Sequence, residues 1–533
     1  MKKILSIFFI LLMTLLNTSC SKGNLKDQIL NYNLPSEPKS LDPQISDDYS
    51  SNIILVNIFE GLTRLDENDN VIPGVAETFE SENNNTLFTF HLRKNTFWSD
   101  ENKTPVTAND FLFGFKRAID KNTQAPFVSS LFCIKNAKKI NSGQLDISNL
   151  GVKVIDDYTL KIELEYPNED FLKITSTLIT MPCNEEFFNS SNGQYGLELK
   201  TILGNGPFKF KNKYGWDHFH NINLVKNENY QGNTLPSING INFEIGKEMT
   251  NTIGKLKNNL LDAALINNSE VNLAKKENMN LVAAEDTLLA LTFNLSDAMY
   301  SNSNIRKGIL SSINRELATS NIPDECTIAN NLTLNDLKVN GSKFINNYGD
   351  ELFIKESSEA KNLLNLGLKE LKASELKGTN ILCLDEPKTK ATVSNIIESL
   401  NKNLKINFNM TPLEKNDLIS RINSKNFQIA LAPTILEDDS AFDFFNTFTS
   451  SSKKNTVSLN DQYYDKLLTQ AYNSNDKNIT IEILSLAEKY LNEKAIIYPI
   501  YKEKKYFACS KNVSGILFYK YKNGVDFLHA KKI

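Results

Sequence analysis

The sequence predicts a mixed α/β fold with full hydrophobic cores. Along the 533 residues, runs with apolar residues at every second position alternate with runs in which apolar residues recur every three or four positions. The first pattern is typical of half-buried strands and the second of amphipathic helices. Hydrophobic residues make up 41% and charged residues 23% of the chain, as in globular proteins. No internal repeat or long low-complexity linker separates these segments, so we expect intertwined domains rather than tethered ones.

Two segments show the strand pattern most clearly. In each of them, apolar side chains share one face and polar or charged side chains share the other. The apolar positions are Phe88, Phe90 and Leu92 in the first segment and Leu160, Ile162 and Leu164 in the second. Both are therefore predicted to be strands with one buried face.

Three segments have the helical pattern, and one of them has a recognisable start. Thr107, followed three residues later by Asp110, resembles a capping box. The predicted core faces are Phe111, Phe115, Ala118 and Ile119; then Val393, Ile396, Ile397, Leu400 and Leu404; and then Ile483, Leu486, Ala487, Tyr490 and Leu491. Stripes of this spacing are expected to pack against the core.

The first residues predict a secretory signal over 1–19. Lys2 and Lys3 precede a largely apolar run from Ile4 to Leu16, which is short for a membrane span. Cys20 follows, and the pattern resembles the bacterial lipoprotein cleavage site, at which the cysteine thiol receives lipid. Asn17 stands three residues before the cysteine, where Leu is usual. We therefore expect lipidation at Cys20; the alternative is an ordinary secretion signal with an incidental cysteine.

The charge and the remaining cysteines exclude some classes of protein. A net charge of −4 gives no support to nucleic-acid binding, so no nucleic-acid partner is expected. Five cysteines remain besides Cys20, an odd number without CxxC spacing, and we interpret them as buried apolar residues rather than a disulfide framework.

The chain has no pattern of residues that indicates catalysis. His218 and His220 alternate on one predicted strand, but two histidines alone are weak support for a metal site. No HExxH, G-x-S-x-G or G-x-G-x-x-G motif occurs. We therefore expect no metal, no cofactor and no enzyme activity.

Several motifs, taken in order, resemble those of one protein family. They are Ser40–Pro43 (SLDP), Ile58–Leu62 (IFEGL), Pro73–Glu77 (PGVAE), Phe88–Asp100 (FTFHLRKNTFWSD), Pro105–Phe111 (PVTANDF), Leu150–Leu164, Asn205–Phe210 (NGPFKF), Asn304–Glu316, Glu359–Leu364 and Asn446–Thr456. Their order and spacing resemble the extracytoplasmic solute-binding proteins of family 5, the oligopeptide- and dipeptide-binding lipoproteins of ABC importers.

This resemblance implies a two-lobed periplasmic-binding-protein-like fold with an additional inserted domain, three domains in all, and a ligand cleft between lobes that close by hinge motion. The implied division is a signal peptide over 1–19 and lobe I over 20–59, 183–287 and 501–533. Inserted domain II would span 60–182, and lobe III would span 288–500.

The resemblance also implies a ligand site, although the chain departs from the family there. In peptide-binding members, an Asp in a segment that usually reads A-G-W-x-A-D-Y binds the α-ammonium of the peptide. Gapless alignment of 427–447 places Glu437 at that position, with Asp438 and Asp439 beside it and Thr434 within the usual Gly-Trp pair. Ligand-binding roles are thus expected for Glu437, Asp438 and Thr434; the alternative is an acidic surface loop.

By this resemblance, the protein would be a monomeric, lipid-anchored receptor at a bacterial cell surface or in a periplasm. It would capture oligopeptides and deliver them to the permease subunits of an ABC transporter. Three alternatives stay open at this point: a non-peptide solute such as a metal chelate or sugar, a surface signalling or adhesion role without transport, and, more remotely, a hydrolase.

Overall fold

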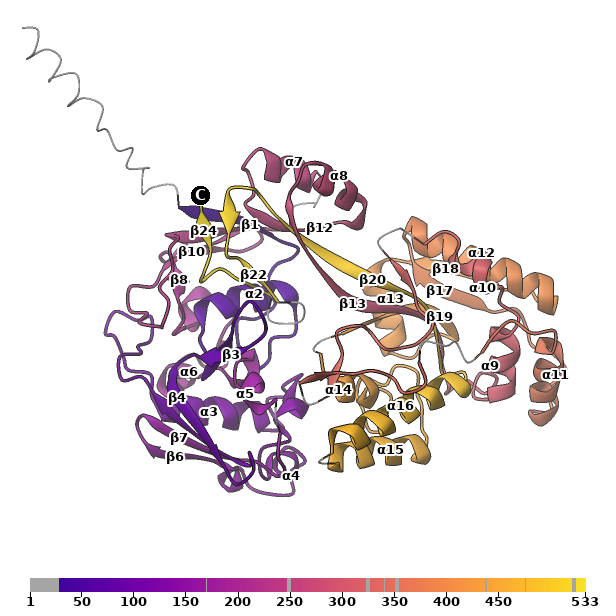
Figure 1. Ribbon diagram of the computed structural model, residues 1–533, viewed down its shortest axis with the longest axis horizontal. Helices are drawn as coiled ribbons and strands as arrows, with labels where there is room; N and C mark the ends of the chain where they lie inside the picture. Colours follow the sequence, from indigo (N-terminus) through magenta and orange to yellow (C-terminus); the bar gives the residue numbers. More distant parts are fainter. Residues whose placement is uncertain are drawn as a thin grey trace, which may run out of the picture.

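The protein consists of two bodies that are joined by a pair of long strands (Figure 1). The computed structural model describes residues 28–533 except 169, 247–250, 323–325, 340, 350–353, 437–438, 475 and 520–523. One body contains the N-terminal half of the chain together with its last residues. The other contains the residues between the two long strands, so the chain crosses from one body to the other and returns.

One 12-stranded sheet runs through both bodies. Its order is β18 (Asn409–Leu413), β17 (Asn380–Leu384), β19 (Ile429–Ile435), β13 (Asn280–Phe293), β20 (Ile497–Cys509), β12 (Ala263–Ile266), β1 (Ile29–Leu34), β11 (Gly240–Ile245), β10 (Asn221–Lys226) and β8 (Phe208–Phe210). Two short strands lie off this path: β14 (Thr327–Ile328) pairs with β20, and β9 (Trp216–Asp217) pairs with β10. Smaller two-stranded sheets pair β2 (Thr63–Leu65) with β3 (Val71–Pro73), β15 (Lys338–Val339) with β16 (Ser342–Lys343), β21 (Val513–Ser514) with β24 (Lys531–Lys532), and β22 (Leu517–Phe518) with β23 (Val525–Asp526).

Strands β13 and β20 are antiparallel and connect the two bodies. In the first body, β12 pairs with the 506–509 end of β20; in the second, β19 pairs with the 287–293 end of β13. The register of the β13–β20 pair shifts between Glu285 and Thr287, close to the middle of both strands. Among the described residues, 503–505 of β20 pair only with β13. A bulge in a two-stranded stretch bends more readily than a flanked ladder, so this stretch has the properties of a hinge.

Lobe I and domain II form the first body and share one hydrophobic core. The domain II sheet has the order β4 (Ala76–Glu82), β5 (Leu87–Leu92), β7 (Thr159–Glu163) and β6 (Val152–Asp156). Tyr32 of β1, Phe90 of β5 and Phe111 of α3 (Ala108–Ile119) belong to the same cluster of buried side chains. The other helices of this body are α2 (Tyr49–Ile58), α4 (Ala137–Asn141), α5 (Phe171–Ile174), α6 (Glu185–Ser190), α7 (Thr252–Lys257) and α8 (Val271–Lys276).

Both predicted strands and the first predicted helix lie in domain II and are confirmed. The Thr107 backbone N–H donates to Asp110 Oδ2 at 2.7 Å, as a capping box requires. The four residues of the expected apolar face of α3 are all fully buried.

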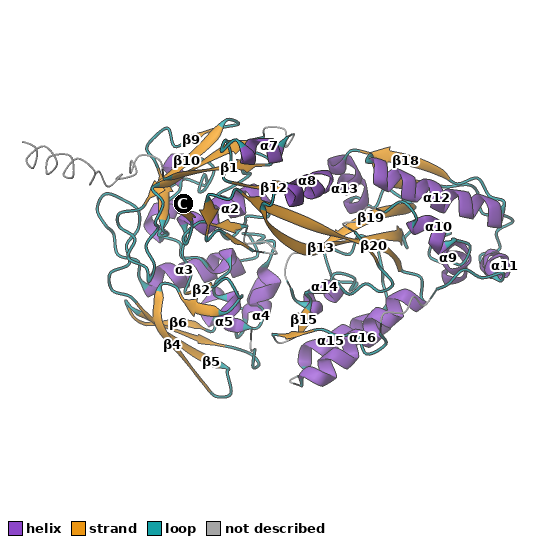
Figure 2. Cartoon of the chain, turned by 45° about the horizontal axis from the view of Figure 1, so that its top comes forward, coloured by secondary structure: helices purple, strands orange, loops and turns teal. Residues whose placement is uncertain are grey.

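Lobe III packs helices on both faces of its part of the sheet (Figure 2). Leu289 and Leu291 of β13 belong to one core, whereas Leu288 and Ala290 belong to another, because alternate side chains point to opposite faces. The helices are α9 (Ser303–Leu310), α10 (Arg315–Thr319), α11 (Ala360–Glu370), α12 (Pro387–Leu404), α13 (Lys415–Asn423), α14 (Ala441–Asn446), α15 (Gln462–Asn473) and α16 (Lys477–Glu493).

The predicted stripe of α12 is confirmed except at Ile397, which is only partly buried, and the predicted stripe of α16 is partly wrong. In α16 the buried apolar residues are Leu484, Ala487 and Leu491, while Ile483 and Leu486 are only partly buried. The core face also contains Glu488, whose carboxylate accepts the backbone N–H groups of Leu332 and Thr333 at 2.6 and 3.0 Å. A pattern based on apolar residues alone does not include Glu488, so it could not identify this face of the helix.

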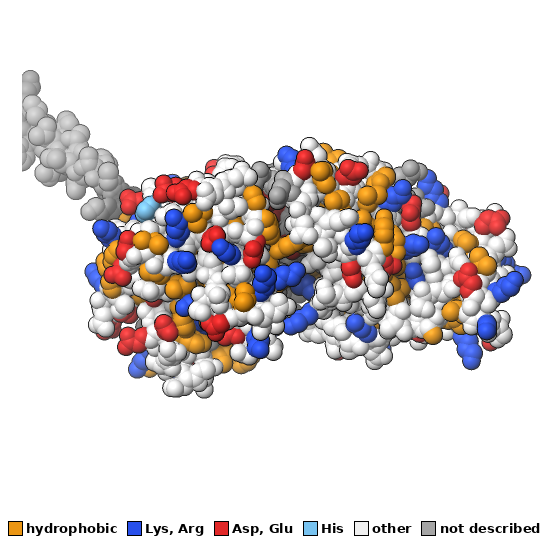
Figure 3. Space-filling model, turned by 90° about the horizontal axis from the view of Figure 1, so that it is seen from below, with side chains coloured by type: hydrophobic (Ala, Val, Ile, Leu, Met, Phe, Trp, Pro, Cys, Tyr) orange, Lys and Arg blue, Asp and Glu red, His pale blue; other side chains and the backbone are white. Residues whose placement is uncertain are grey.

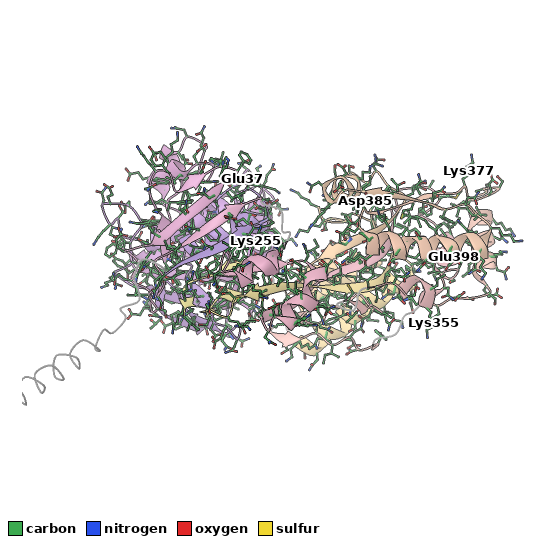
Figure 4. The ribbon with its side chains drawn as sticks, turned by 90° about the horizontal axis from the view of Figure 1, so that it is seen from above. Glu37, Lys255, Lys355, Lys377, Asp385 and Glu398 are labelled. Atoms are coloured by element: carbon green, nitrogen blue, oxygen red, sulfur yellow. The ribbon has the colours of Figure 1, made fainter. Side chains whose placement is uncertain are left out.

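The predicted domain boundaries at 287/288 and 500/501 fall inside the crossing strands β13 and β20. Viewed from above, Glu37 marks the first body, and Asp385 and Glu398 mark the second (Figure 4). The five cysteines of the described chain are buried and form no disulfide, which confirms their interpretation as apolar residues. No helix among the described residues has the length and apolar character needed to span a membrane.

The SLDP motif has a structural role at the junction of lobe I and domain II. Asp42 accepts two hydrogen bonds from the Arg117 guanidinium of α3, at 3.2 and 2.6 Å. The Arg117 side chain also lies over the Phe188 ring, 3.9 Å from its centroid. Burial disfavours the charged guanidinium, but attraction and hydrogen bonding from Asp42 outweigh it and raise the pKa of Arg117.

Replacing Asp42 should therefore destabilise the first body. Asp42→Ala leaves the Arg117 charge buried without its partner, which typically costs about 3–5 kcal/mol. Urea unfolding should show a lower midpoint for Asp42→Ala than for wild type. Asp47→Ala is the matched control, because the pair between Asp47 and Lys39 is exposed; equal midpoints for the two variants would contradict the assignment.

Candidate functional site

A cleft of about 830 Å³ lies between the two bodies. The first body lines it with residues from 43–52, which include the start of α2, from 121–141 and from 173–179. Lobe III lines it with residues from 434–454 and 465–472. In the space-filling view from below, the surface is hollowed between the two bodies (Figure 3). A pocket that both bodies line would enclose a ligand when they approach each other.

The end of β19 carries Thr434, one of the three predicted ligand residues, to the cleft. Thr434 and Leu436 line the cleft, and the Leu436 backbone N–H donates to the Asp286 carbonyl at 2.7 Å. Asp286 lies at the β13 bulge, so this wall of the cleft is fixed directly to the hinge. Glu437 and Asp438 lie outside the described residues, as does Cys20.

Among the described carboxylates, Asp439 is the nearest in sequence to Glu437, the predicted anchor. Two lysines pair with it. Its Oδ2 lies 2.6 Å from Nζ of Lys173 in domain II and 2.9 Å from Nζ of Lys338 in lobe III. Burial disfavours the ionised carboxylate, but attraction to Lys173 and hydrogen bonds from both lysines outweigh it and lower the pKa of Asp439. The sequence places Asp439 beside Glu437, but it gives no means of finding the two lysines, which are far away along the chain.

A second polar contact between the bodies lies beside this ion pair. The Gly341 backbone N–H, in the turn between β15 and β16, donates to Asp170 Oδ2 of domain II at 3.2 Å. Burial raises the pKa of Asp170, although Lys173 opposes that shift. The two contacts together place four charged side chains, Asp170, Lys173, Lys338 and Asp439, at one edge of the cleft.

Tyr472 of α15 makes a further contact between the two bodies. Its hydroxyl donates to the Phe132 carbonyl at 3.3 Å, and its ring packs edge-on against Tyr166 with 5.1 Å between ring centroids. Phe132 and Tyr166 both belong to domain II. The two bodies therefore meet through charged contacts at Asp439 and Asp170 and through an aromatic contact at Tyr472.

The apolar run Leu288–Leu291 in β13 does not line the cleft. All four residues are buried in the two cores of lobe III. Their apolar character thus serves packing and carries no information on the ligand.

No group of three or more His, Cys, Asp or Glu side chains in the described part of the chain could hold a metal ion. His218 instead pairs with Glu37, with 2.7 Å between Nδ1 and Oε1.

Comparison with known proteins gives the family. Residues 70–456 match the model of the bacterial extracellular solute-binding proteins, family 5. The chain belongs to this family. The Bacillus subtilis dipeptide-binding protein DppE is 26% identical over 499 residues, covering 92% of this chain and 90% of DppE. The periplasmic oligopeptide-binding protein OppA of Salmonella typhimurium is 28% identical over 493 residues, covering 89% and 87% of the two chains.

Solved structures have the same fold. The substrate-binding domain of an oligopeptide ABC transporter from Bacillus anthracis superposes with a TM-score of 0.78 at 25% identity, covering 95% of this chain and 98% of that one. Peptide-bound OppA of Listeria monocytogenes gives a TM-score of 0.78 at 23% identity, covering 95% and 99%. The predicted family and the three-domain binding-protein fold are confirmed. The family consists of extracellular solute-binding proteins and is not enzymatic. The expected location outside the cytoplasm and the expected binding role are therefore confirmed, and the alternative of a hydrolase is excluded.

The pair between Lys173 and Asp439 should help to hold the cleft closed. In Lys173→Met, Asp439 keeps Lys338, which belongs to its own body, so the ion pair between the bodies is lost. We expect a larger radius of gyration for the unliganded variant in small-angle X-ray scattering. Lys489→Met removes a pair within α16 and should leave the scattering unchanged. Indistinguishable curves for Lys173→Met and wild type would refute this role.

Proposed function

We propose that the protein captures peptides outside the membrane and delivers them to the permease of an ABC transporter. The observation that carries this proposal is the cleft between two bodies whose crossing strands contain a bulge. A ligand that contacts both bodies favours the closed state, because it binds that state more tightly than the open one. The permease could then distinguish a closed, loaded receptor from an open, empty one. The names of the relatives DppE and OppA supply the ligand class.

Glu437 is proposed as the group that binds the peptide α-ammonium. Its neighbours Leu436 and Asp439 both line the cleft, and Asp439 already pairs with two lysines. An ammonium removed from water needs a charged partner. Asp438 is the alternative carboxylate, and Thr434 offers a hydroxyl that could bond to the peptide backbone.

Native mass spectrometry and calorimetry test the ligand class and the anchor together. Wild-type protein should retain ligands with peptide masses. Glu437→Gln should bind a free-amine peptide from that set more weakly by about 2–5 kcal/mol, the usual cost of truncating one partner of a desolvated pair.

The N-acetylated form of the same peptide is the control, because it has no ammonium and should be affected much less. Unchanged affinity of Glu437→Gln for the free-amine peptide would exclude Glu437 as the anchor. Retained ligands with the masses of a non-peptide solute would refute the proposed ligand class.

The proposed function includes a lipid anchor at Cys20. The first described strand, β1, begins at Ile29, so a short segment would connect the lipid to lobe I. Two or more acyl chains give stable anchoring where a single chain gives marginal binding.

A fatty-acid analogue fed to cells should label the wild-type protein and fail to label Cys20→Ala. Cys133→Ala is a matched control, since it removes a buried thiol from the folded protein and should leave labelling intact. Equal labelling of wild type and Cys20→Ala, or no labelling of either, would rule out the anchor.

A further inference from the structure

We infer that one edge of lobe I, formed by the turns 211–215 and 218–220, rests on the lipid bilayer to which Cys20 attaches the protein. The two turns lie at either end of the short strand β9. They carry Tyr214 and Phe219, which are 72% and 74% exposed and are the most exposed aromatic side chains in the described part of the chain. The inference rests on the lipid anchor of the proposed function and adds to it the face of the protein that meets the membrane.

The backbone at Phe219 has a conformation that aromatic residues rarely adopt. Its φ of 63° lies in the left-handed region, where a side chain with a β-carbon is strained. The Glu37 carboxylate fixes this turn: Oε2 accepts the Phe219 backbone N–H at 2.8 Å, and Oε1 accepts the Trp216 ring N–H at 2.9 Å. A strained residue that keeps an aromatic ring in water adds nothing to the core, so the arrangement indicates a role outside the fold.

A row of rings next to the turns makes this edge rigid. Trp216 stacks on Phe210 with 6.2 Å between ring centroids, and the centroid of the His218 ring lies 4.5 Å from that of Trp216. His218 Nε2 also lies 3.5 Å from Glu198 Oε2, which brings the exposed neighbour of Glu198, Leu197, to the same edge. Aromatic and leucine side chains on a protein surface are typical of contacts at the boundary between lipid headgroups and acyl chains.

The charges at this edge suit a surface of lipid phosphates. Lys211 and Lys213 are both exposed, and Lys213 Nζ lies 5.0 Å from the centroid of the Tyr214 ring. Two carboxylates of the edge already have partners within it: Glu37 binds the Phe219 turn, and Asp217 Oδ1 lies 3.6 Å from His220 Nδ1. Lysines next to aromatic rings at a bilayer surface are attracted by anionic headgroups.

The lipid is close enough along the chain to bring this edge to the membrane. Strand β1 begins at Ile29, and β11 and β10 separate it from β9 in the sheet (Figure 2). From the strand registers, with strands about 4.8 Å apart and about 3.3 Å per residue along them, Phe219 lies about 20 Å from Ile29. Cys20 precedes Ile29 by nine residues, which span at most about 32 Å. A bilayer that holds the Cys20 lipid can therefore touch Phe219.

Membrane contact at this edge would leave the ligand site free. The residues 211–220 do not line the cleft. Because lobe I and domain II share one core, the contact would orient the whole first body and leave lobe III to move. The lipid would keep the protein near the membrane, and this edge would set the direction in which the first body faces.

The test measures lipid contact at residue 219 in the full-length, lipidated protein. Phe219→Cys carries a nitroxide spin label; the five cysteines of the described chain are buried, and the Cys20 thiol is acylated. The protein is inserted through its lipid into nanodiscs of phosphatidylcholine and phosphatidylglycerol. Electron paramagnetic resonance should show several-fold lower accessibility of the label to a water-soluble nickel chelate than at a control site, together with higher accessibility to oxygen.

Leu366→Cys provides the control site, because Leu366 is exposed on α11, far from β9 at the other end of the molecule (Figure 1). Tyr214→Cys provides a second test site that leaves the strained turn intact. Protection from the chelate at 219 or 214, but not at 366, would support the contact.

Equal accessibility at 219, 214 and 366 in nanodiscs would overturn the membrane contact and leave the anchor standing. Failure of the protein to enter nanodiscs would overturn the anchor and this inference with it. Neither result bears on the proposed ligand class, because peptide binding at the cleft is measured separately by calorimetry.

Discussion

The antiparallel pairing of β13 with β20 is the constraint on which the rest of the structure depends. These strands hold two bodies with separate cores in one continuous sheet. Each end of the pair is flanked by further strands, which fix it rigidly to its own body. Only the middle, with its bulge at Glu285–Thr287, lacks such support among the described residues. Any change in the distance between the bodies must therefore be absorbed there, because the flanked ends cannot bend without breaking ladder hydrogen bonds.

One hydrogen bond links the hinge to the wall of the cleft that Thr434 and Leu436 form. The Leu436 backbone N–H donates to the carbonyl of Asp286, the residue inside the bulge. The segment that carries Glu437 thus begins at the point where the strands can bend. A ligand that moves this segment would act on the hinge directly, with no chain of intervening side chains. A direct backbone hydrogen bond of this kind can couple ligand binding to the hinge motion that closes the cleft.

The sequence predicted most of what depends on local pattern. The strands around Phe90 and Ile162, the capped helix after Thr107 and the stripe of α12 follow from periodicity, and the structure confirms them. Prediction failed where a charged residue takes part in a core, as Glu488 does in α16. A carboxylate there is tolerated because backbone N–H groups of a loop more than 150 residues away satisfy it. No pattern within the helix itself can reveal such a partner.

The candidate site also has one part that the sequence predicted and another that only the structure reveals. The family motifs directed attention to the segment after β19, and Thr434 does line the cleft, whereas the roles of Glu437, Asp438 and Cys20 stay predictions. The pairing of Asp439 with Lys173 could not be predicted, because these residues meet only when lobe III faces domain II. The lysines that line the cleft could not be placed together from the sequence either, because Lys121 and Lys138 belong to one body and Lys453 and Lys454 belong to the other.

Because lobe I and domain II share one core, closure is a motion of two bodies rather than three. The Asp42–Arg117 bond reinforces this by joining the 40–43 loop to α3. Domain II therefore carries Lys173, Lys121 and Lys138 towards lobe III as a unit. At Asp439 the protein supplies both signs of charge itself, one from each body. A cleft built in this way can close weakly on its own ion pair and more firmly when a ligand contacts both bodies.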